Sequence, residues 1–171
     1  MKRSCMVILV LVVVLIAGCS SAKLNVQRMT LHLEDVQKEG AFIGFYSFAA
    51  GKLPIPPDPN RVEIVYYFDR DDCSGGALIG QDDRPGYFFP IGKKTWRELE
   101  KIKPPSEDKE SVVGIRPLTK DKEGLVFWVK TRSGDFVLAR IASLQPTSYS
   151  DLVRGGSAGL TLEWRRSEVR Q

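Results

Sequence analysis

Residues 124–142, GLVFWVKTRSGDFVLARIA, contain two apolar segments on either side of Ser133-Gly134. Both segments are rich in valine and aromatic residues that favour strands, and a serine–glycine pair is typical of a tight turn. A two-residue turn at this pair predicts a hairpin in which Trp128 lies opposite Ala139. Because apolar side chains then lie on both faces, we expect this hairpin to be central, packed on both sides or between two sheets.

Shorter segments with strand character surround the hairpin. In VEIVYYFD, residues 62–69, alternate residues from Val62 to Phe68 share one face, and Tyr67 lies on the other face with Glu63. Apolar and polar residues also alternate in LTLEW, where Leu160, Leu162 and Trp164 are expected inward. The complete set of further expected strands is 28–35, 41–48, 62–69, 77–80, 86–92 and 158–166.

One segment has helical periodicity instead. In TWRELEKI, Trp96, Leu99 and Ile102 recur at intervals of three residues, and Thr95 with Glu98 matches a capping box. Pro104-Pro105 is expected to end this helix after about two turns. The proline-rich residues 53–60 are expected to form a stiff extended loop.

These elements predict a mainly β fold. We expect a single antiparallel β-sandwich or open barrel-like domain over residues 24–166, with one short helix near 96–102. Residues 167–171 are expected to form a polar tail. Removing the first 18 of 171 residues leaves a chain of ordinary domain size.

The amino-terminal segment has a different character. Lys2 and Arg3 precede a continuous apolar run over 7–17, which has the length of a signal-peptide core and is too short to span a bilayer. The run ends in Ile16-Ala17-Gly18-Cys19, which resembles the lipobox of bacterial lipoproteins. The resemblance covers residues 1–19 only, and no family is identified for the rest of the chain.

The resemblance implies a processed, acylated protein. Residues 1–18 would be a cleaved signal peptide, Cys19 would receive fatty chains such as palmitate, and residues 19–23 would form a tether. Two or more acyl chains hold a protein stably on a membrane. In Gram-negative lipoproteins an aspartate after the cysteine favours the inner membrane, so Ser20 predicts an outer-membrane protein facing the periplasm if the host has two membranes.

Composition excludes several functions. The formal net charge of +4 falls to about +2 once Lys2 and Arg3 are removed, too small an excess to indicate nucleic-acid binding. Of the three cysteines only Cys73 would remain as a free thiol in the domain, so no intrachain disulfide is expected. His32 is the single histidine and alternates with leucines, so we expect an exposed or structural residue and no catalytic site.

Acidic turns and aromatic residues offer the remaining candidate sites. Aspartates flank two predicted turns and could hold Ca²⁺ if the turns meet, but arginines in the same turns oppose this, so we expect no metal and no cofactor. These aspartates are Asp69, Asp71, Asp72, Asp82 and Asp83. A ligand-binding surface could use Tyr67, Tyr87 and Trp128, although aromatics at strand spacing more often pack in a core.

The sequence therefore predicts a non-enzymatic, lipid-anchored protein of the cell envelope. Its membrane partner would be reached through the acyl chains on Cys19, and its domain would bind or scaffold an envelope protein or polysaccharide. One alternative is a carbohydrate- or Ca²⁺-dependent recognition module. Another is a hydrolase with an unassigned carboxylate site.

Overall fold

The computed structural model describes residues 25–36, 41–69, 76–80, 87–106, 110–145, 148–156 and 158–167. The described strands form two sheets whose paired strands are antiparallel. The first sheet has the order β1 (Gln27–His32), β11 (Gly159–Arg166), β10 (Phe136–Gln145), β9 (Leu125–Lys130) and β7 (Phe88–Lys93). The second has the order β2 (Glu34–Val36), β3 (Ala41–Ser47), β5 (Ile64–Asp69), β6 (Ala77–Ile79) and β8 (Gly114–Ile115), with β4 (Gly51–Lys52) paired to β3.

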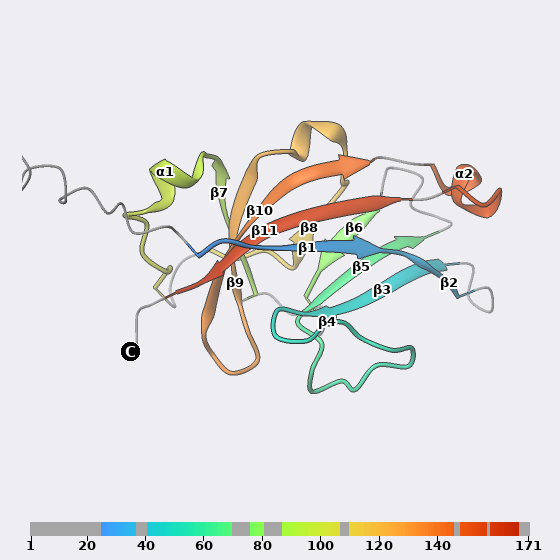
Figure 1. The fold of residues 1–171 in the computed structure, drawn as a ribbon, viewed down its shortest axis with the longest axis horizontal. Coiled ribbons are helices and arrows are strands. Elements are labelled where there is room, and N and C mark those ends of the chain that lie inside the picture. The colour runs from blue at the N-terminus through green and yellow to red at the C-terminus, as the bar shows by residue number, and fades with distance from the viewer. Residues whose placement is uncertain are drawn as a thin grey trace, which may run out of the picture.

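Within the described residues, three short helices accompany the sheets: α1 (Trp96–Leu99), the 3₁₀ turn η1 (Lys120–Lys122) and α2 (Tyr149–Val153). The two sheets pack face to face, and α1 and α2 lie at opposite ends of the long axis (Figure 1). The predicted mainly β, sandwich-like fold is therefore confirmed. The helix predicted near 96–102 is present but covers only one turn, and α2 was not predicted.

The main core lies between the sheets and is built from the alternation of the strands. In β11 the inward residues Leu160, Leu162 and Trp164 are all buried, as the sequence predicted. They meet aromatic residues of the second sheet, and the rings of Phe48 and Trp164 lie 5.1 Å apart. Burial of such apolar area is the main source of stability in a sandwich.

A second cluster covers the outer face of the first sheet. It is formed by the outward residues of the central hairpin and by α1, and its buried members are Phe89, Leu99, Val126, Trp128, Phe136 and Leu138. Both faces of β9 and β10 are therefore packed, which confirms the prediction of a central hairpin.

The register of this hairpin differs from the prediction by one residue. Trp128 lies opposite Leu138, and Phe127 lies opposite Ala139. Thr131 and Asp135 close a three-residue loop, in which Gly134 adopts a φ of +88°. This loop replaces the predicted two-residue turn, and its glycine in the left-handed region is typical of three-residue hairpin loops.

The expected strand over residues 28–35 is also wrong as a single element. The chain leaves the first sheet after His32 and enters the second at Glu34, so β1 and β2 belong to different sheets. The buried Tyr46 hydroxyl fixes this transition because it accepts a hydrogen bond from the His32 N–H and donates one to the His32 carbonyl at 2.7 Å. Gly44 permits the close approach, since a Cβ there would collide with the His32 carbonyl oxygen.

The structure also tests the predictions for β5 and for the loop before it. Residues 53–63 form neither helix nor strand, which agrees with the predicted extended loop over 53–60. The strand begins at Ile64, later than predicted, and Val62 packs with Leu53 and Val65 on the outer side of the second sheet. Val62 therefore does not share the inward face of Ile64.

Candidate functional site

The best-defined polar arrangement among the described residues lies on the outer face of the first sheet. The strand registers place Arg28 of β1 opposite Glu163 of β11, and Glu163 opposite Arg140 of β10. Residues directly opposite each other in adjacent strands point to the same face. Three charged side chains therefore form one row, which we call the Glu163 row.

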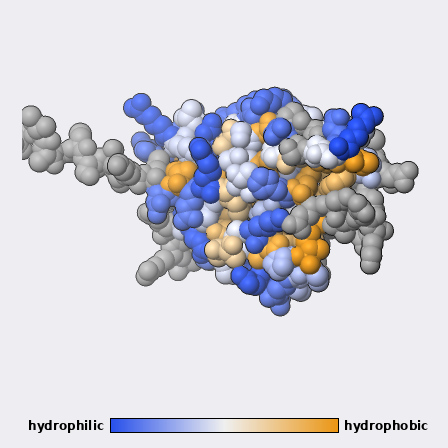
Figure 2. All heavy atoms as spheres, turned by 45° about the vertical axis from the view of Figure 1, so that its right-hand side comes forward, coloured by the Kyte–Doolittle hydropathy of each residue, from blue (hydrophilic) through white to orange (hydrophobic). Residues whose placement is uncertain are grey.

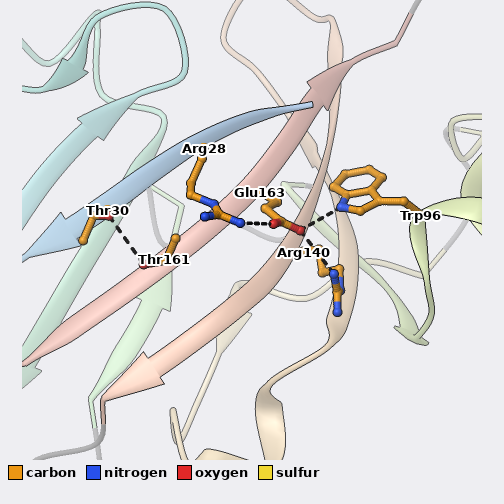
Figure 3. Close-up of polar contacts among 6 residues, drawn as sticks. All are labelled: Arg28, Thr30, Trp96, Arg140, Thr161 and Glu163. Atoms are coloured by element: carbon orange, nitrogen blue, oxygen red, sulfur yellow. Dashed lines mark hydrogen bonds and ion pairs between the residues drawn. The ribbon is translucent and has the colours of Figure 1, made fainter. Parts of the chain in front are cut away.

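Glu163 is the acceptor at the centre of this row. Its Oε1 accepts a hydrogen bond from Arg28 Nη2 at 2.6 Å, and its Oε2 accepts one from Arg140 Nη1 at 3.2 Å. Oε2 also accepts a bond of 2.8 Å from the indole Nε1 of Trp96, which reaches over from α1 (Figure 3). The glutamate side chain is 14% exposed, whereas that of Arg28 is 68% exposed.

The electrostatics keep this carboxylate ionised. The hydrogen bonds from Arg28 and from Trp96, together with the nearby Arg140 charge, hold the pKa of Glu163 below its usual range. A carboxylate with a lowered pKa is a poor proton donor or acceptor near neutral pH. The row thus suits the binding of a polar partner, or the fastening of α1, better than acid–base catalysis.

A second row of hydroxyl groups runs beside the first. Thr161 of β11 lies opposite Thr30 of β1 and Ser143 of β10, and the Oγ1 atoms of the two threonines are 3.4 Å apart (Figure 3). Together the two rows form a polar strip with guanidinium donors at one end and hydroxyls at the other. Such a strip can bind oxygen-rich groups through several hydrogen bonds.

Hydrogen bonds from β11 and within the α1 segment hold α1 in place. Besides the Trp96–Glu163 bond, Nη2 of Arg165 donates to the carbonyl oxygen of Leu99 at 2.8 Å, near the carboxyl end of α1. At the other end, the Glu98 carboxylate accepts bonds from the backbone N–H and the hydroxyl of Thr95. The predicted Glu98-to-Thr95 contact of a capping box is therefore present.

Two nitrogen atoms beside the strip have no partner among the described residues. These are Nε of Arg140 and Nε1 of Trp128, both buried. Trp128 is only 2% exposed, and the rings of Trp128 and Phe136 lie 6.2 Å apart. Its indole is therefore not accessible to a ligand, because the outer cluster and α1 cover it.

The other two aromatic candidates lie apart from Trp128. Tyr67 is half-buried on the outer face of the second sheet, against Val65 and its neighbours. Tyr87 is half-buried against the main core and lines a shallow hollow with Val62, Glu63, Lys130 and Arg132. The structure does not bring the three predicted aromatic residues together into one binding surface.

The acidic candidates and the cysteines are placed only in part. Asp69 is the last residue of β5, while Asp71, Asp72, Asp82 and Asp83 lie outside the described residues, as do Cys19 and Cys73. Among the residues that the structure describes, no three histidine, cysteine, aspartate or glutamate side chains are grouped as metal ligands would be. His32 is exposed at the end of β1.

Sequence reasoning did not identify the Glu163 row. The alternation in residues 158–166 correctly predicted that Glu163 faces outward. The partners of Glu163 lie on β1 and β10, which are far apart in the sequence. They can be identified only when the order of strands in the sheet is known. A glutamate between apolar residues on a predicted strand, in a chain with outward arginines on other strands, was the available signal.

Comparison with known proteins does not assign the chain to a class, since it matches no family model, no curated protein and no solved structure. Within the described residues, no helix combines the length and apolar character needed to cross a bilayer.

Proposed function

We propose that the protein is a lipid-anchored component of the cell envelope whose β-sandwich binds or scaffolds another envelope component without catalysis. The single observation that supports the anchor most directly is the leader, in which Lys2-Arg3 and a short apolar run end at Ile16-Ala17-Gly18-Cys19. Acyl chains on Cys19 would hold the protein stably at the membrane. Ser20 favours the outer membrane, facing the periplasm, in a host with two membranes.

The polar strip supports a binding role for the domain. Arg28 and Thr30 are exposed on β1, and the ionised Glu163 holds the guanidinium of Arg28 in a defined position. An oriented guanidinium recognises carboxylates and other oxygen-rich groups well. A protein surface or a polysaccharide of the envelope offers such groups.

The surface outside the strip is mixed in character. On the face drawn in Figure 2, hydrophilic residues predominate and hydrophobic residues form small separate areas, apart from the atoms drawn in grey. A partner bound at this face would therefore meet mainly polar groups. This favours recognition through hydrogen bonds over docking through a large apolar patch.

A carbohydrate-recognition module is the alternative that a specific observation favours. Thr30, Thr161 and Ser143 present hydroxyls in one row, and the half-buried Trp96 is bonded to Glu163 in the neighbouring row. Hydrogen bonds to hydroxyls beside an aromatic ring are suited to sugars. The Ca²⁺-dependent alternative depends on aspartates of which four lie outside the described residues, so it stays a prediction, as does the hydrolase.

The anchor is tested by metabolic labelling with palmitate. We expect the wild-type protein to incorporate label and to fractionate with membranes, and the Cys19→Ala variant to do neither. Label that persists in Cys19→Ala would contradict the assigned site. A purified mature protein that lacks acyl chains would contradict the anchor itself.

The binding role is tested by cross-linking in living cells. A photoreactive amino acid at Thr30 should capture one defined protein or polysaccharide, whereas the same group at the exposed Arg154, after α2, should not. Equal capture from both positions, or capture of lipid alone from Thr30, would contradict a binding role for the strip.

A further inference from the structure

The position of β1 in the chain limits which part of the sandwich can lie next to the membrane. Eight residue steps separate Cys19 from Gln27, the first residue of β1. A fully extended chain of this length reaches at most about 29 Å. If Cys19 holds the acyl chains, the start of β1 therefore stays within about 29 Å of the bilayer surface.

The start of β1 lies beside α1 and the end of β11. Gln27 is opposite Trp164 and Arg28 is opposite Glu163, so β1 begins where β11 ends. Contacts from Glu163 to Trp96 and from Arg165 to Leu99 attach α1 to the same part of the sheet. In Figure 1, α1 accordingly lies at the left end of the molecule, where the blue strand starts.

Basic residues predominate at this end. Trp96, Leu99 and Ile102 pack towards the sheet. The polar residues of α1 and of the segment directly after it face solvent. Those that are basic and exposed are Arg97, Lys101 and Lys103. We define the basic end as these three residues with the exposed Arg166 at the end of β11.

The acidic residues nearby compensate for only part of this charge. The Glu98 carboxylate is bonded to Thr95, and Glu163 is already shared by two arginines. Glu100 is the further glutamate in the α1 segment, where it is exposed. Among the described residues of this end, positive charge therefore exceeds negative charge at the surface close to the start of β1.

The opposite end of the molecule has no such excess in the part that the structure describes. Between the two ends, in η1 and the residue after it, Lys120 pairs with Glu123 at 2.7 Å and Lys122 pairs with Asp121 at 3.2 Å. In and after α2, Asp151 is balanced by Arg154. The charge distribution along the molecule is therefore uneven.

We propose that the basic end rests on an anionic phospholipid surface, namely the leaflet into which the acyl chains of Cys19 insert. This inference rests on the proposed lipid anchor. The attraction between basic residues and anionic lipid falls off within a Debye length, about 8 Å at physiological ionic strength. The short tether keeps the basic end within reach of that layer, and the uneven charge orients α2 away from the membrane.

The experiment uses the acylated full chain, purified from membranes and reconstituted in nanodiscs. One set of discs contains only phosphatidylcholine and the other also contains about one third phosphatidylglycerol. Backbone amide hydrogen exchange is measured over α1 and the start of β1. We expect exchange at least threefold slower in the anionic discs, and we expect high salt to abolish the difference because it shortens the Debye length.

Two matched double variants test the residues. Arg97→Glu/Lys101→Glu should lose the protection in anionic discs. Arg116→Glu/Arg154→Glu changes the net charge equally at exposed residues elsewhere and should retain it. Circular dichroism of each variant verifies that it is folded.

The outcomes separate this inference from the anchor on which it rests. The mass of the amino-terminal peptide reports directly whether Cys19 is acylated, and an unacylated peptide would overturn the proposed function. An acylated chain with the same exchange in both kinds of disc would overturn the orientation alone. Protection of α2 in place of α1 would also overturn it.

Discussion

Glu163 connects three elements through one carboxylate. Its two oxygen atoms accept hydrogen bonds from Arg28 on β1, Arg140 on β10 and Trp96 on α1. Without this acceptor, the guanidinium and indole donors would face each other on a partly buried surface. We therefore expect Glu163 to contribute to stability as well as to the shape of the polar strip.

The Glu163→Gln variant tests this contribution. At neutral pH the substitution should lower the free energy of unfolding by about 1–3 kcal/mol, because it removes a charged acceptor and directs an amide towards existing donors. Urea titration measures the change. Glu100→Gln, at an exposed residue directly after α1, is the matched control and should leave stability unchanged.

The same pair of proteins should respond differently to acid. The pKa of Glu163 is lowered in the folded state, so an unfolded chain takes up the proton first as the pH falls. The stabilisation by ionised Glu163 is therefore present above the ordinary glutamate pKa of about 4.3. It is lost as the pH falls through the pKa that Glu163 has in the folded state. The difference between wild type and Glu163→Gln should narrow below about pH 4, and a constant difference would contradict this role.

The buried Tyr66 should make the stability of the protein depend on pH in the alkaline range. Burial, and then the neighbouring Tyr46, raise the pKa of Tyr66 to about 12. Between about pH 10 and 12 the folded protein keeps a proton that an unfolded tyrosine releases, so stability should fall as the pH rises. Tyr66→Phe should reduce this slope, and urea unfolding of wild type and variant at several alkaline pH values measures the difference.

Local sequence patterns predicted the positions of most strands well. They predicted poorly how the chain passes from one strand to the next. Alternating, aromatic-rich and short apolar segments located β3, β5, β6, β7, β9, β10 and β11 to within a few residues. They could not show that the chain changes sheets between His32 and Glu34, because that step depends on Tyr46 and Gly44 in another strand. The helix α2 did have a local signal, since Ser148 and Asp151 form a capping box that was overlooked.

The loop between β9 and β10 depends on one glycine. Gly134 has a φ of +88°, a region that L-residues with a Cβ adopt only with strain. Gly134→Ala should therefore lower the free energy of unfolding by about 1–2 kcal/mol.

Gly159→Ala is the control for that substitution. Gly159 lies within β11, and a Cβ there would meet a side-chain atom of Gln145 at an ordinary 3.7 Å. Because glycine weakens a strand, this variant should be neutral or slightly more stable in thermal unfolding. An equal loss in both variants would argue against strain in the loop.

At the scale of the whole molecule, the first sheet separates two apolar clusters. The hairpin sequence predicted packing on both faces, and the fold class followed from the number and spacing of strands. The Glu163 row could not be predicted in the same way, because it requires the order β1–β11–β10. Strand order is set by the sum of many weak long-range contacts and leaves no short motif in the sequence.

Leu138 and Leu162 distinguish the two clusters experimentally. Both are fully buried, but Leu138 lies in the outer cluster beneath α1 and Leu162 lies between the sheets. Either substitution by alanine should lower the free energy of unfolding by about 2–5 kcal/mol.

Hydrogen exchange should then separate the two variants. Leu138→Ala should accelerate exchange in α1 more than in the second sheet, because it loosens only the outer cluster. Leu162→Ala should accelerate exchange in both sheets. Indistinguishable patterns would mean that the two clusters unfold as one unit.

The pairing of β1 with β11 has a mechanical consequence for a protein held by its amino terminus. All six residues of β1 pair with β11, and the strand leads away in sequence from Cys19, the proposed anchor. A force that drags the domain away from its attachment would act along β1 and load these backbone bonds simultaneously in shear. Detaching β1 would therefore require breaking them together instead of peeling them apart one after another.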